Sequence, residues 1–513
     1  MSDGSDVTAD VIVVGGGNAA MCAAVSAAEQ GASVLVLERA PRDARGGNSA
    51  FTEAAFRVVY EGDEDMKRLV PDLTQGDFDK NDFGTYTRDR YFDELIEMSN
   101  MRADADLVST LVDNSLDTAL WMRTHGVRWI PIHGRQSFLV DGKQRFWGGL
   151  TVQVSGGGAG LMETLFARAE KLGAHVRYDH KVTDLLWRDG RTAGVVATHE
   201  GKRVEIESRA VILAAGGFHA NAEWRARYLG QNWDLAKPRG SRYNTGLAIT
   251  AALAQGARAA GHWSGCHSVF YDANAPLFGD PALLNQQKNY FSWGIVVNTA
   301  GQRFINEGFN FRNYIYSLMG AEILKQPGAR GWQLFDATTA ALLPAEYQVR
   351  HATRVQADTV EALVDKLEGV DKPALLKTVR EFNAAITRDV PFNPAALDGR
   401  RTQGLAIDKT NWAMPLETGP FVAYEVGCGI TCTYGGLGIT PKAEVVSEEG
   451  PAMPGLYATG EMVGGLYYGK YPGGAGLMAG SVFGRIAGSE AARVAKAGQV
   501  APAKQAAQVT RGA

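Results

Sequence analysis

Cysteine is scarce in this chain, and the few residues present form no recognisable framework. The 513 residues include four cysteines, Cys22, Cys266, Cys428 and Cys432. Their spacing matches neither a disulfide scaffold nor a Cys-x-x-Cys-His haem attachment sequence. Cys428 and Cys432 have no histidine pair nearby, so we expect no metal site. Such low cysteine usage is typical of a reducing compartment, and we expect a cytoplasmic protein.

Long apolar runs and clustered charge of one sign are also missing. No stretch of ~18 apolar residues occurs, so we expect no membrane span, and residues 1–10 lack the apolar segment of a signal peptide. The formal net charge is −4 and no basic run is present, which argues against a nucleic-acid partner. A hydrophobic content of 45% over 513 residues instead predicts a globular protein with two or more domains.

Glycine, in contrast, is abundant, with 61 residues that cluster along the chain. Residues 10–38 read as a buried strand, a glycine turn, an alanine-rich helix and a second strand. In this unit Gly15 suits the tight turn, Gly17 admits a phosphate close to the backbone, and Ala20 permits close packing of helix on strand. Glu38 ends the second strand, where a carboxylate can accept hydrogen bonds from a ribose hydroxyl. The unit predicts a dinucleotide-binding, Rossmann-like fold with the helix start facing the phosphates.

The character of the sequence changes along the chain. Glycine-rich strand and helix patterns return at 432–493, whereas 263–431 is richer in aromatic residues, prolines and irregular segments. This alternation predicts a discontinuous nucleotide-binding domain, residues 1–262 and 432–499, with a capping domain inserted at 263–431. The alanine-, lysine- and glutamine-rich end, 500–513, is expected to form a disordered tail.

Several segments together resemble the flavoprotein subunits of fumarate reductase and succinate dehydrogenase. The resemblance extends over nearly the full chain, and the matching segments are the N-terminal glycine unit, 46–49, 214–217, 297–298, 303–307, 454–461, 473–477 and 483–485. It implies an α/β fold in which a discontinuous Rossmann-like FAD-binding domain carries an inserted α+β capping domain. It also implies bound FAD, and a non-covalent link is expected because Asn48 and Ser49 stand in the second glycine motif rather than a histidine.

The same resemblance assigns parts of the cofactor to particular residues. It places Glu38 at the adenosine ribose, Glu461 near the ribityl chain and the backbone of 474–478 at the pyrimidine edge of the flavin. A helix that begins there would stabilise the anionic reduced flavin through its dipole. The expected cofactor-binding residues are Gly15, Gly17, Asn18, Ala19, Ala20, Glu38, Arg39, Gly46, Gly47, Asn48, Ser49, Val182, Ala215, Gly216, Glu461, Gly474, Gly476 and Leu477.

Within that family the sequence is most similar to the FAD-dependent tricarballylate dehydrogenases. The matching segments are 45–49, 121–128, 265–267, 306–314, 433–437 and 471–474. This narrower resemblance implies a small-molecule substrate, a tricarballylate-like polycarboxylate, which loses hydride to flavin N5 and gains a C=C bond next to a carboxylate or carbonyl. Because no internal haem or iron–sulfur motif is present, it also implies that electrons leave to a separate acceptor protein, often a membrane-bound one.

Departures from the fumarate reductase pattern indicate which chemistry remains. The family's proton-transferring arginine follows the glutamate of Asn-Glu by four residues, whereas Arg312 follows Glu307 by five. Gln287 and Tyr290 stand near the expected Glu-x-x-Arg proton relay, and neither side chain can serve it. Efficient fumarate reduction is therefore not expected.

The positions that contact substrate differ as well. Cys432 stands where the family has a substrate-binding histidine, and Tyr471 replaces its second carboxylate-binding arginine. His267 is the residue that retains its expected role as a hydrogen-bond donor to substrate. The catalytic candidates are therefore Arg312, Tyr471 and His267, with either Arg312 or a tyrosine as the base.

A polycarboxylate substrate also requires several cations near the flavin. Arg239 and Arg242 lie in 238–244, and Arg145 lies in a segment, 134–149, that reads as a loop over a pocket. Guanidinium groups suit this task because they bind carboxylates through paired hydrogen bonds. With Tyr434 as a further donor, these arginines complete the expected substrate-binding set.

Two alternative functions stay open. The tyrosines and Tyr-Pro-Gly at 471–473 resemble the ketosteroid dehydrogenases, which implies desaturation of a bulkier apolar ketone. The chain could instead be a flavin-binding electron-transfer subunit without substrate chemistry. A pocket dominated by Arg312 and Arg239 would favour the acid, and one dominated by tyrosines and apolar side chains would favour the ketone. A site closed to N5 would favour the third function.

Overall fold

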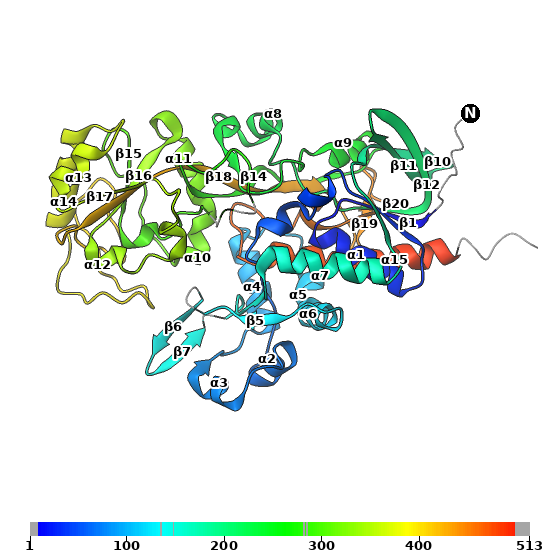
Figure 1. The fold of residues 1–513 in the computed structure, drawn as a ribbon, viewed down its shortest axis with the longest axis horizontal. Coiled ribbons are helices and arrows are strands. Elements are labelled where there is room, and N and C mark those ends of the chain that lie inside the picture. Colours follow the sequence, from blue (N-terminus) through cyan, green and yellow to red (C-terminus); the bar gives the residue numbers. More distant parts are fainter. Residues whose placement is uncertain (1–8, 134–135, 147, 281–282, 284–285, 498–513) are drawn as a thin grey trace, which may run out of the picture.

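The computed structural model describes the chain with short gaps, over residues 9–133, 136–146, 148–280, 283 and 286–497. The expected tail at 500–513 lies outside these residues. Figure 1 shows three parts, a body and a cap at opposite ends of the long axis and a lobe that projects below them. We call 9–51, 156–258 and 438–497 the body, 52–155 the lobe and 273–420 the cap.

The body is built on a parallel sheet that starts at the N-terminus. Its central strand, β1 (Ala9–Val14), is fully buried and lies between β12 (Lys202–Leu213) and β2 (Val34–Leu37), parallel to both. β9 (His175–Arg177) extends one side, and β20 (Ala452–Ala458) with β19 (Glu444–Val446) extends the other. The first half of β12 leaves this layer and pairs in antiparallel order with β11 (Arg191–His199), which in turn pairs with β10 (Lys181–Arg188).

Two helices pack closely against one another beside this sheet, α1 (Asn18–Glu29) and α15 (Ala475–Ala497). Small residues make the close approach possible. A Cβ atom on Gly488 would lie 2.3 Å from the backbone oxygen of Ala23, and one on Gly484 would lie 2.5 Å from that of Ala19. The N-terminal and C-terminal segments of the chain therefore form one core, which confirms the expected Rossmann-like, discontinuous arrangement.

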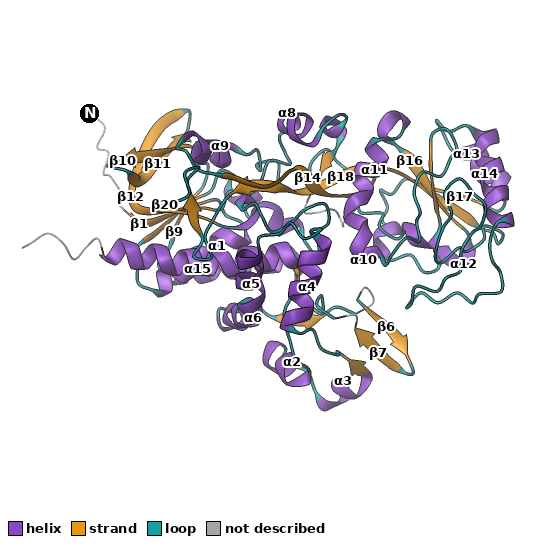
Figure 2. Cartoon of the chain, turned by 180° about the vertical axis from the view of Figure 1, so that it is seen from behind, coloured by secondary structure: helices purple, strands orange, loops and turns teal. Residues whose placement is uncertain are grey.

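A long two-stranded ribbon connects body and cap. It consists of β14 (Ala259–Asp272) and β18 (Phe421–Leu437), which pair in antiparallel order with His267 opposite Cys432. Figure 2 shows the ribbon running across the middle of the molecule. The predicted domain limits after 262 and 431 fall inside these two strands, so the body passes into the cap through continuous hydrogen-bonded structure rather than through linkers.

The cap has its own sheet and core. The first residues of β18 lie between β16 (Gly331–Phe335), which also pairs with β15 (Ile295–Asn298), and β17 (Arg354–Ala357). α13 (Val360–Lys366) and α14 (Lys372–Ala384) bury Leu363, Leu375 and Phe382 in a core with this sheet. The cap therefore mixes helices and strands, as predicted. Its other helices are α10 (Arg312–Ile315), α11 (Met319–Leu324) and α12 (Ala337–Ala340).

The lobe was not distinguished from the body by sequence. It contains short helices and two small sheets, and it projects from the body in Figure 1. The helices are α2 (Asp63–Leu69), α3 (Gln75–Lys80), α4 (Arg88–Met98), α5 (Ala105–Asp113) and α6 (Ser115–Thr124). The strands are β3 (Ala55–Phe56), β4 (Asn81–Asp82), β5 (Trp129–Pro131), β6 (Ser137–Val140), β7 (Lys143–Phe146) and β8 (Val152–Val154).

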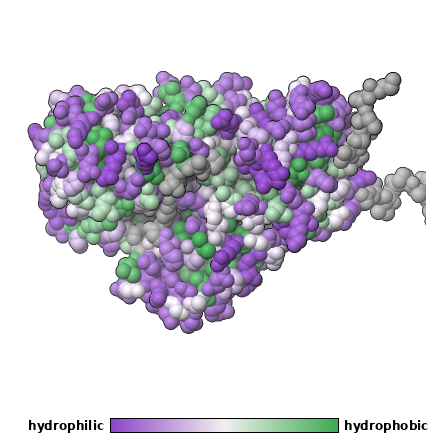
Figure 3. Space-filling model, in the orientation of Figure 1, coloured by the Kyte–Doolittle hydropathy of each residue, from purple (hydrophilic) through white to green (hydrophobic). Residues whose placement is uncertain are grey.

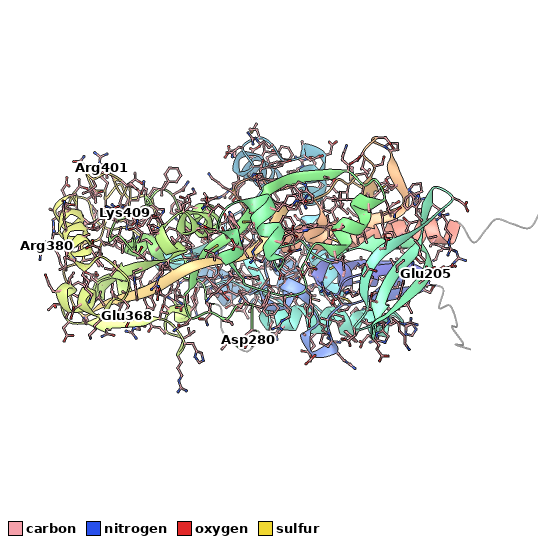
Figure 4. The ribbon with its side chains drawn as sticks, turned by 90° about the horizontal axis from the view of Figure 1, so that it is seen from above. Glu205, Asp280, Glu368, Arg380, Arg401 and Lys409 are labelled. Atoms are coloured by element: carbon pink, nitrogen blue, oxygen red, sulfur yellow. The ribbon has the colours of Figure 1, made fainter. Side chains whose placement is uncertain are left out.

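Charged side chains cover the outside of all three parts. Figure 3 shows hydrophilic residues over much of one face, with apolar residues scattered among them. In Figure 4 Glu205 lies at the body end, whereas Arg380 and Arg401 lie at the cap end. Lys409, labelled beside Arg401, differs because it is buried in the cap, where its ammonium group donates to the backbone oxygens of Ser292 (2.8 Å) and Gly294 (2.7 Å). Among the described residues no helix is both long and apolar enough to cross a bilayer.

Candidate functional site

A long groove opens at the carboxyl ends of β1 and β2, where open α/β sheets bind nucleotides. The turn after β1 depends on Gly15, whose φ of +110° is open to glycine, and a Cβ atom there would lie 2.4 Å from the backbone oxygen of Ala214. α1 begins directly after this turn, at Asn18. The backbone N–H of Asn18 donates to Oγ of Ser49 (3.0 Å), which joins the two glycine motifs at one place.

One end of the groove is lined by Glu38, Arg39, His180 and Val182. Glu38 is 6% exposed and accepts a hydrogen bond from the backbone N–H of Ala40 (2.7 Å). Burial raises the pKa of its carboxyl, while backbone N–H donors, including that of Ala40, lower it. The Arg39 guanidinium is held beside the groove by Oγ1 of Thr245 (2.8 Å). A buried acid at the end of β2 suits a sugar hydroxyl, which can donate to it.

Farther along the groove Glu461 gathers donors from several segments. Its Oε1 accepts from the backbone N–H of Thr433 (2.9 Å), and its Oε2 accepts from the amides of Asn48 and Asn244 (each 3.4 Å). Burial raises the pKa of Glu461, but its interactions with His219 and Thr433 outweigh this and leave the pKa below its ordinary value. The carboxylate therefore ties the second glycine motif, the ribbon and β20 together around the middle of the groove.

The start of α15 closes the far end of the groove. Gly476 and Leu477, in the first turn of this helix, line the groove. The backbone N–H of Gly476 donates to the hydroxyl oxygen of Tyr471 (2.9 Å). The positive end of a 23-residue helix thus faces the cavity, where it would stabilise negative charge on a ligand.

A second cavity adjoins that end of the groove, and the two share Asn48, Thr52, Thr431, Tyr471 and Leu477. All three parts of the molecule contribute to its walls. The lobe contributes Ile132, Gln136 and Leu150, the cap contributes Gln287, Asn289, Arg312, Tyr316 and Glu346, and Arg239, His267 and Gly473 come from the body and the ribbon. A substrate in this cavity would therefore lie against a flavin in the groove.

Two of the predicted arginines line this second cavity. Arg239 donates to Oγ1 of Thr431 (2.7 Å), and its guanidinium lies over the ring of Tyr271 at 5.8 Å. Burial lowers the pKa of Arg239, and Tyr271 partly offsets this effect. Arg312, at the start of α10, lies over the ring of Tyr290 at 4.2 Å, so an aromatic face supports its guanidinium.

His267 lies between the tyrosines of the cavity and is 4% exposed. Within the described part of the chain neither ring nitrogen has a hydrogen-bond partner. Burial, together with the charge of Arg239, lowers the pKa of His267 to about 3, so the ring is neutral. A buried polar group without a partner is costly unless a ligand satisfies it. His267 therefore offers one N–H donor and one acceptor to a ligand.

Three tyrosines surround His267 and the start of α15. The ring of Tyr316 meets that of His267 edge-on at 5.0 Å, and Tyr471 does so at 4.9 Å. Tyr434 stacks on Tyr471 with centroids 6.5 Å apart, and it does not line either cavity. Burial raises the pKa of Tyr316 to about 12, while Arg239 lowers it, and burial raises the pKa of Tyr471 well above its ordinary range.

The structure gathers most of the predicted cofactor residues in one place. The groove is lined by Gly15, Gly17, Asn18, Ala19, Glu38, Arg39, Gly47, Asn48, Ser49, Val182, Ala215, Gly216, Glu461, Gly476 and Leu477. Gly474 lies in the wall of the second cavity instead. Ala20 is buried, and Gly46 precedes the turn of Gly47 with a φ of +105°, so both shape the groove from behind.

Two of the predicted substrate arginines lie elsewhere. Arg242 is exposed, with its guanidinium over the ring of Phe278 at 5.3 Å, and it lines neither cavity. Arg145 lies on β7 in the lobe, where its exposed side chain pairs with Asp82 at 3.0 Å. Both guanidinium groups lie at the surface rather than in a cavity. The sequence could not show this, because alternation along an irregular segment says little about the direction of a side chain.

Several site residues were missed by sequence reasoning. Tyr316 lies two residues beyond the segment that carried the resemblance, and Asn289 lies in an irregular stretch. Asn244 and His180 also line the groove without a motif of their own. For Tyr316 the available signal was its closeness in sequence to Arg312, because one turn of helix places residues four apart on the same side.

Comparison with known proteins agrees with this geometry. A family model described as an FAD binding domain matches residues 10–477. A fumarate reductase (cytochrome) from Shewanella frigidimarina is 27% identical over 492 residues, which cover 95% of this chain and 78% of that protein. A 4-oxocyclohex-2-ene-1-carboxylate 5-dehydrogenase from Sinomonas cyclohexanicum is 29% identical over 581 residues, which cover 96% of this chain and 95% of that protein.

Solved structures show the same fold. The open conformation of a flavocytochrome c3 fumarate reductase matches with a TM-score of 0.73 and 24% identity, over 96% of this chain and 79% of that one. The groove and the family match together show that the protein binds FAD and is an FAD-dependent oxidoreductase. Since the family model extends over most of its length, the chain belongs to the FAD binding domain family.

Proposed function

We propose that this oxidoreductase is a dehydrogenase that forms a C=C bond next to a carboxylate, with a tricarballylate-like polycarboxylate as its substrate. The observation that carries the proposal is that Arg239 and Arg312 line a cavity that shares Tyr471 and Leu477 with the cofactor groove. FAD bound in the groove supplies the hydride acceptor, flavin N5. The protein itself must bind the acid, orient it and accept a proton.

Binding of the acid falls to the two arginines and to His267. Each guanidinium can hold one carboxylate through paired hydrogen bonds. His267, whose low pKa keeps it neutral, can donate to a further oxygen without adding charge. The acid Glu346 and the amide Asn289 also line the cavity. We therefore expect a third carboxylate of the substrate to accept hydrogen bonds from neutral donors such as Asn289, rather than to bind a third cation.

We assign removal of the substrate proton to Tyr316. Its ring touches that of His267 and its side chain lines the cavity beside Arg239. Burial raises the pKa of Tyr316 to about 12, so its hydroxyl is protonated at neutral pH, and the charge of Arg239 reduces the cost of forming the phenolate that accepts the substrate proton. Arg312 is a poor base because a guanidinium keeps its proton. Tyr471, whose hydroxyl oxygen already accepts from Gly476, keeps its own proton free to donate to the oxygen that gains negative charge.

Relatives support the class of reaction. By their names they include a fumarate reductase, an NADH:acrylate oxidoreductase and a urocanate reductase, which act on carboxylates with a C=C bond, and a 5-dehydrogenase of 4-oxocyclohex-2-ene-1-carboxylate. These names support a carboxylate as the substrate, which Arg239 and Arg312 in the second cavity could bind. We further propose a separate acceptor protein for the electrons, since the motifs for an internal haem or iron–sulfur centre are missing from the sequence.

A second candidate is a ketone desaturase, and the tyrosines favour it. Tyr316 and Tyr471 flank His267, and apolar Ile132, Leu150 and Leu477 line the same cavity. Hydroxyl donors suit a carbonyl oxygen that becomes enolate-like. The Sinomonas relative is named for a substrate that has both a ketone and a carboxylate, so one site of this kind can serve either group.

Anaerobic bleaching of the flavin absorbance tests the two candidates. The panel would contain tricarballylate, succinate, 4-oxocyclohexane-1-carboxylate and a 3-ketosteroid. Bleaching by tricarballylate that is lost in Arg312→Ala, but retained in Arg242→Ala, would support the polycarboxylate. Arg242 is a matched control because it lies outside both cavities. Bleaching by the steroid alone would contradict the role of the arginines and favour the ketone.

A further inference from the structure

Arg57, a buried arginine of the lobe, contacts the loop between the two cavities. This residue directly follows β3 and its side chain is 5% exposed. Its Nε donates to the backbone oxygen of Gly473 (2.9 Å), and its backbone N–H donates to that of Gly474 (3.3 Å). One residue of the lobe therefore holds two successive peptide groups of the loop that precedes α15.

The charge of Arg57 is balanced on the lobe side. Its Nη1 lies 2.8 Å from Oε2 of Glu94 and donates to the hydroxyl oxygen of Tyr86 (2.9 Å). The Tyr86 hydroxyl in turn donates to Glu94, which closes a triangle of three side chains. Burial lowers the pKa of Arg57, but Tyr86 and Glu94 outweigh this effect and raise it, so the guanidinium stays charged. Hydrogen bonds to a charged group of this kind are stronger than neutral ones.

The loop has little freedom to move away from Arg57. Gly474 has a φ of +80°, in the left-handed region that favours glycine. A Cβ atom on this residue would lie 2.3 Å from Cδ1 of Leu150 and 2.9 Å from the backbone nitrogen of Arg57. The loop is thus packed against the lobe as well as hydrogen-bonded to it.

What this loop positions is the start of α15. Gly473 and Gly474 line the second cavity, and Gly476 and Leu477 line the cofactor groove. The helix runs for 23 residues from Ala475, so its N-terminal end directs the positive end of the helix dipole at the groove. Any change in the direction of this loop changes where that positive end points.

We propose that Arg57 is a positioning residue that sets the reduction potential of the bound flavin. Two-electron reduction places negative charge on the flavin, and the aligned start of α15 stabilises that charge more than it stabilises the oxidised ring. Arg57 keeps the helix start aligned by holding Gly473 and Gly474. This inference depends on FAD binding, which the family match shows, and not on the proposed substrate.

The test is the midpoint potential of the FAD-loaded protein, measured by equilibration with a redox dye. Arg57→Lys keeps the charge but cannot make the same set of hydrogen bonds. We expect it to favour reduced flavin about tenfold less, which is a shift of about 30 mV to more negative potential. Arg303→Lys is the matched control, because Arg303 is a buried arginine in the cap that pairs with Glu307 at 2.6 Å.

The control separates positioning from a purely structural role. Loss of hydrogen bonds from a buried guanidinium lowers the thermal stability of both variants, and we expect the potential to shift in Arg57→Lys alone. An unchanged potential in Arg57→Lys, or an equal shift in Arg303→Lys, would overturn the proposal. If Arg57→Lys does not fold, Tyr86→Phe decides, because it removes the two hydrogen bonds of the Tyr86 hydroxyl and leaves the ion pair between Arg57 and Glu94. A shift of the same sign, smaller than tenfold, is expected there, and no shift would overturn the proposal.

Discussion

The cofactor groove and the adjoining cavity, which we propose binds substrate, are lined by different parts of the residues. The groove is walled largely by backbone and small residues of a few contiguous motifs, with Glu38 and Glu461 as its acids. The substrate cavity is walled by long side chains from all three parts of the molecule, such as Arg312 from the cap and Ile132 from the lobe. Backbone contacts hardly depend on side-chain identity, whereas the substrate cavity changes its chemistry with each substitution.

This difference explains how one cofactor site can serve many substrates. Relatives at 27–29% identity act on fumarate or on a cyclic keto acid, according to their names. Here Cys432 and Tyr471 stand where the fumarate reductase pattern has a histidine and an arginine. Both residues line the groove, and Tyr471 also lines the second cavity, so the pattern changes near the place where we propose that substrate binds. Variants in the two cavities should therefore have separate effects, on turnover or on cofactor retention.

The largest expected effect belongs to the substrate cavity. Tyr316→Phe removes the proposed proton acceptor, and the rate of flavin reduction by substrate should fall by about 10²–10⁴-fold. The FAD content and visible spectrum should not change, because Tyr316 does not line the groove. Single-turnover stopped-flow measurements give this rate, with Tyr228→Phe as a control from an aromatic cluster outside both cavities. A normal rate of flavin reduction in Tyr316→Phe would contradict the role of Tyr316 as proton acceptor.

The next effect belongs to the groove. Glu461→Ala leaves the donors of Thr433 and Asn244 without their acceptor, at a cost of about 1–3 kcal/mol for each buried group. We expect FAD affinity to fall by about 100-fold, measured by calorimetric titration of the apoprotein. Glu448→Ala, an exposed acid in the body, is the control. If Glu461→Ala binds FAD normally and only its turnover falls, Glu461 acts on the reaction rather than on cofactor binding, which would contradict the separate roles of groove and cavity.

A smaller effect concerns pH. The pKa of His267 is about 3 in the folded protein and about 6.5 in the unfolded chain, so between these values the unfolded chain binds the extra proton. The free energy of unfolding should therefore fall as pH falls below about 6.5, by about 1.4 kcal/mol per unit. His267→Asn removes this contribution, and urea unfolding at pH 5 and 7 compares the two proteins. If the free energy of unfolding changes equally between pH 5 and pH 7 in the two proteins, His267 is protonated in the folded state at pH 5.

The smallest effect is expected at Arg145. Its side chain is 58% exposed and pairs with Asp82, 41% exposed, and neither residue lines either cavity. Arg145→Ala should change the free energy of unfolding by less than about 1 kcal/mol, as is typical of surface pairs. Steady-state kinetics should show unchanged kcat and KM. A tenfold rise in KM would show that the lobe brings Arg145 to the substrate after all.

The groove could be predicted because its parts are local in sequence. A strand, a tight turn and a helix start within residues 10–18 already define where a phosphate would lie, and α1 begins at Asn18 as expected. The same holds for Glu38 at the end of β2. The contacts of Arg242 and Arg145 could not be predicted in this way, since the direction of a surface side chain depends on neighbours that are distant in sequence.

The amino-acid sequence alone determined the Rossmann-like body, because strand–turn–helix spacing sets it locally, and the family resemblance of its motifs implied FAD. The tertiary structure decided which side chains line the second cavity. Tyr316, His267 and Arg239 come from different elements and meet because the ribbon of β14 and β18 carries the cap over the end of the groove. It also decided that Arg57 of the lobe holds the loop before α15, a contact between residues more than 400 apart. Contacts of that kind depend on packing across the whole fold.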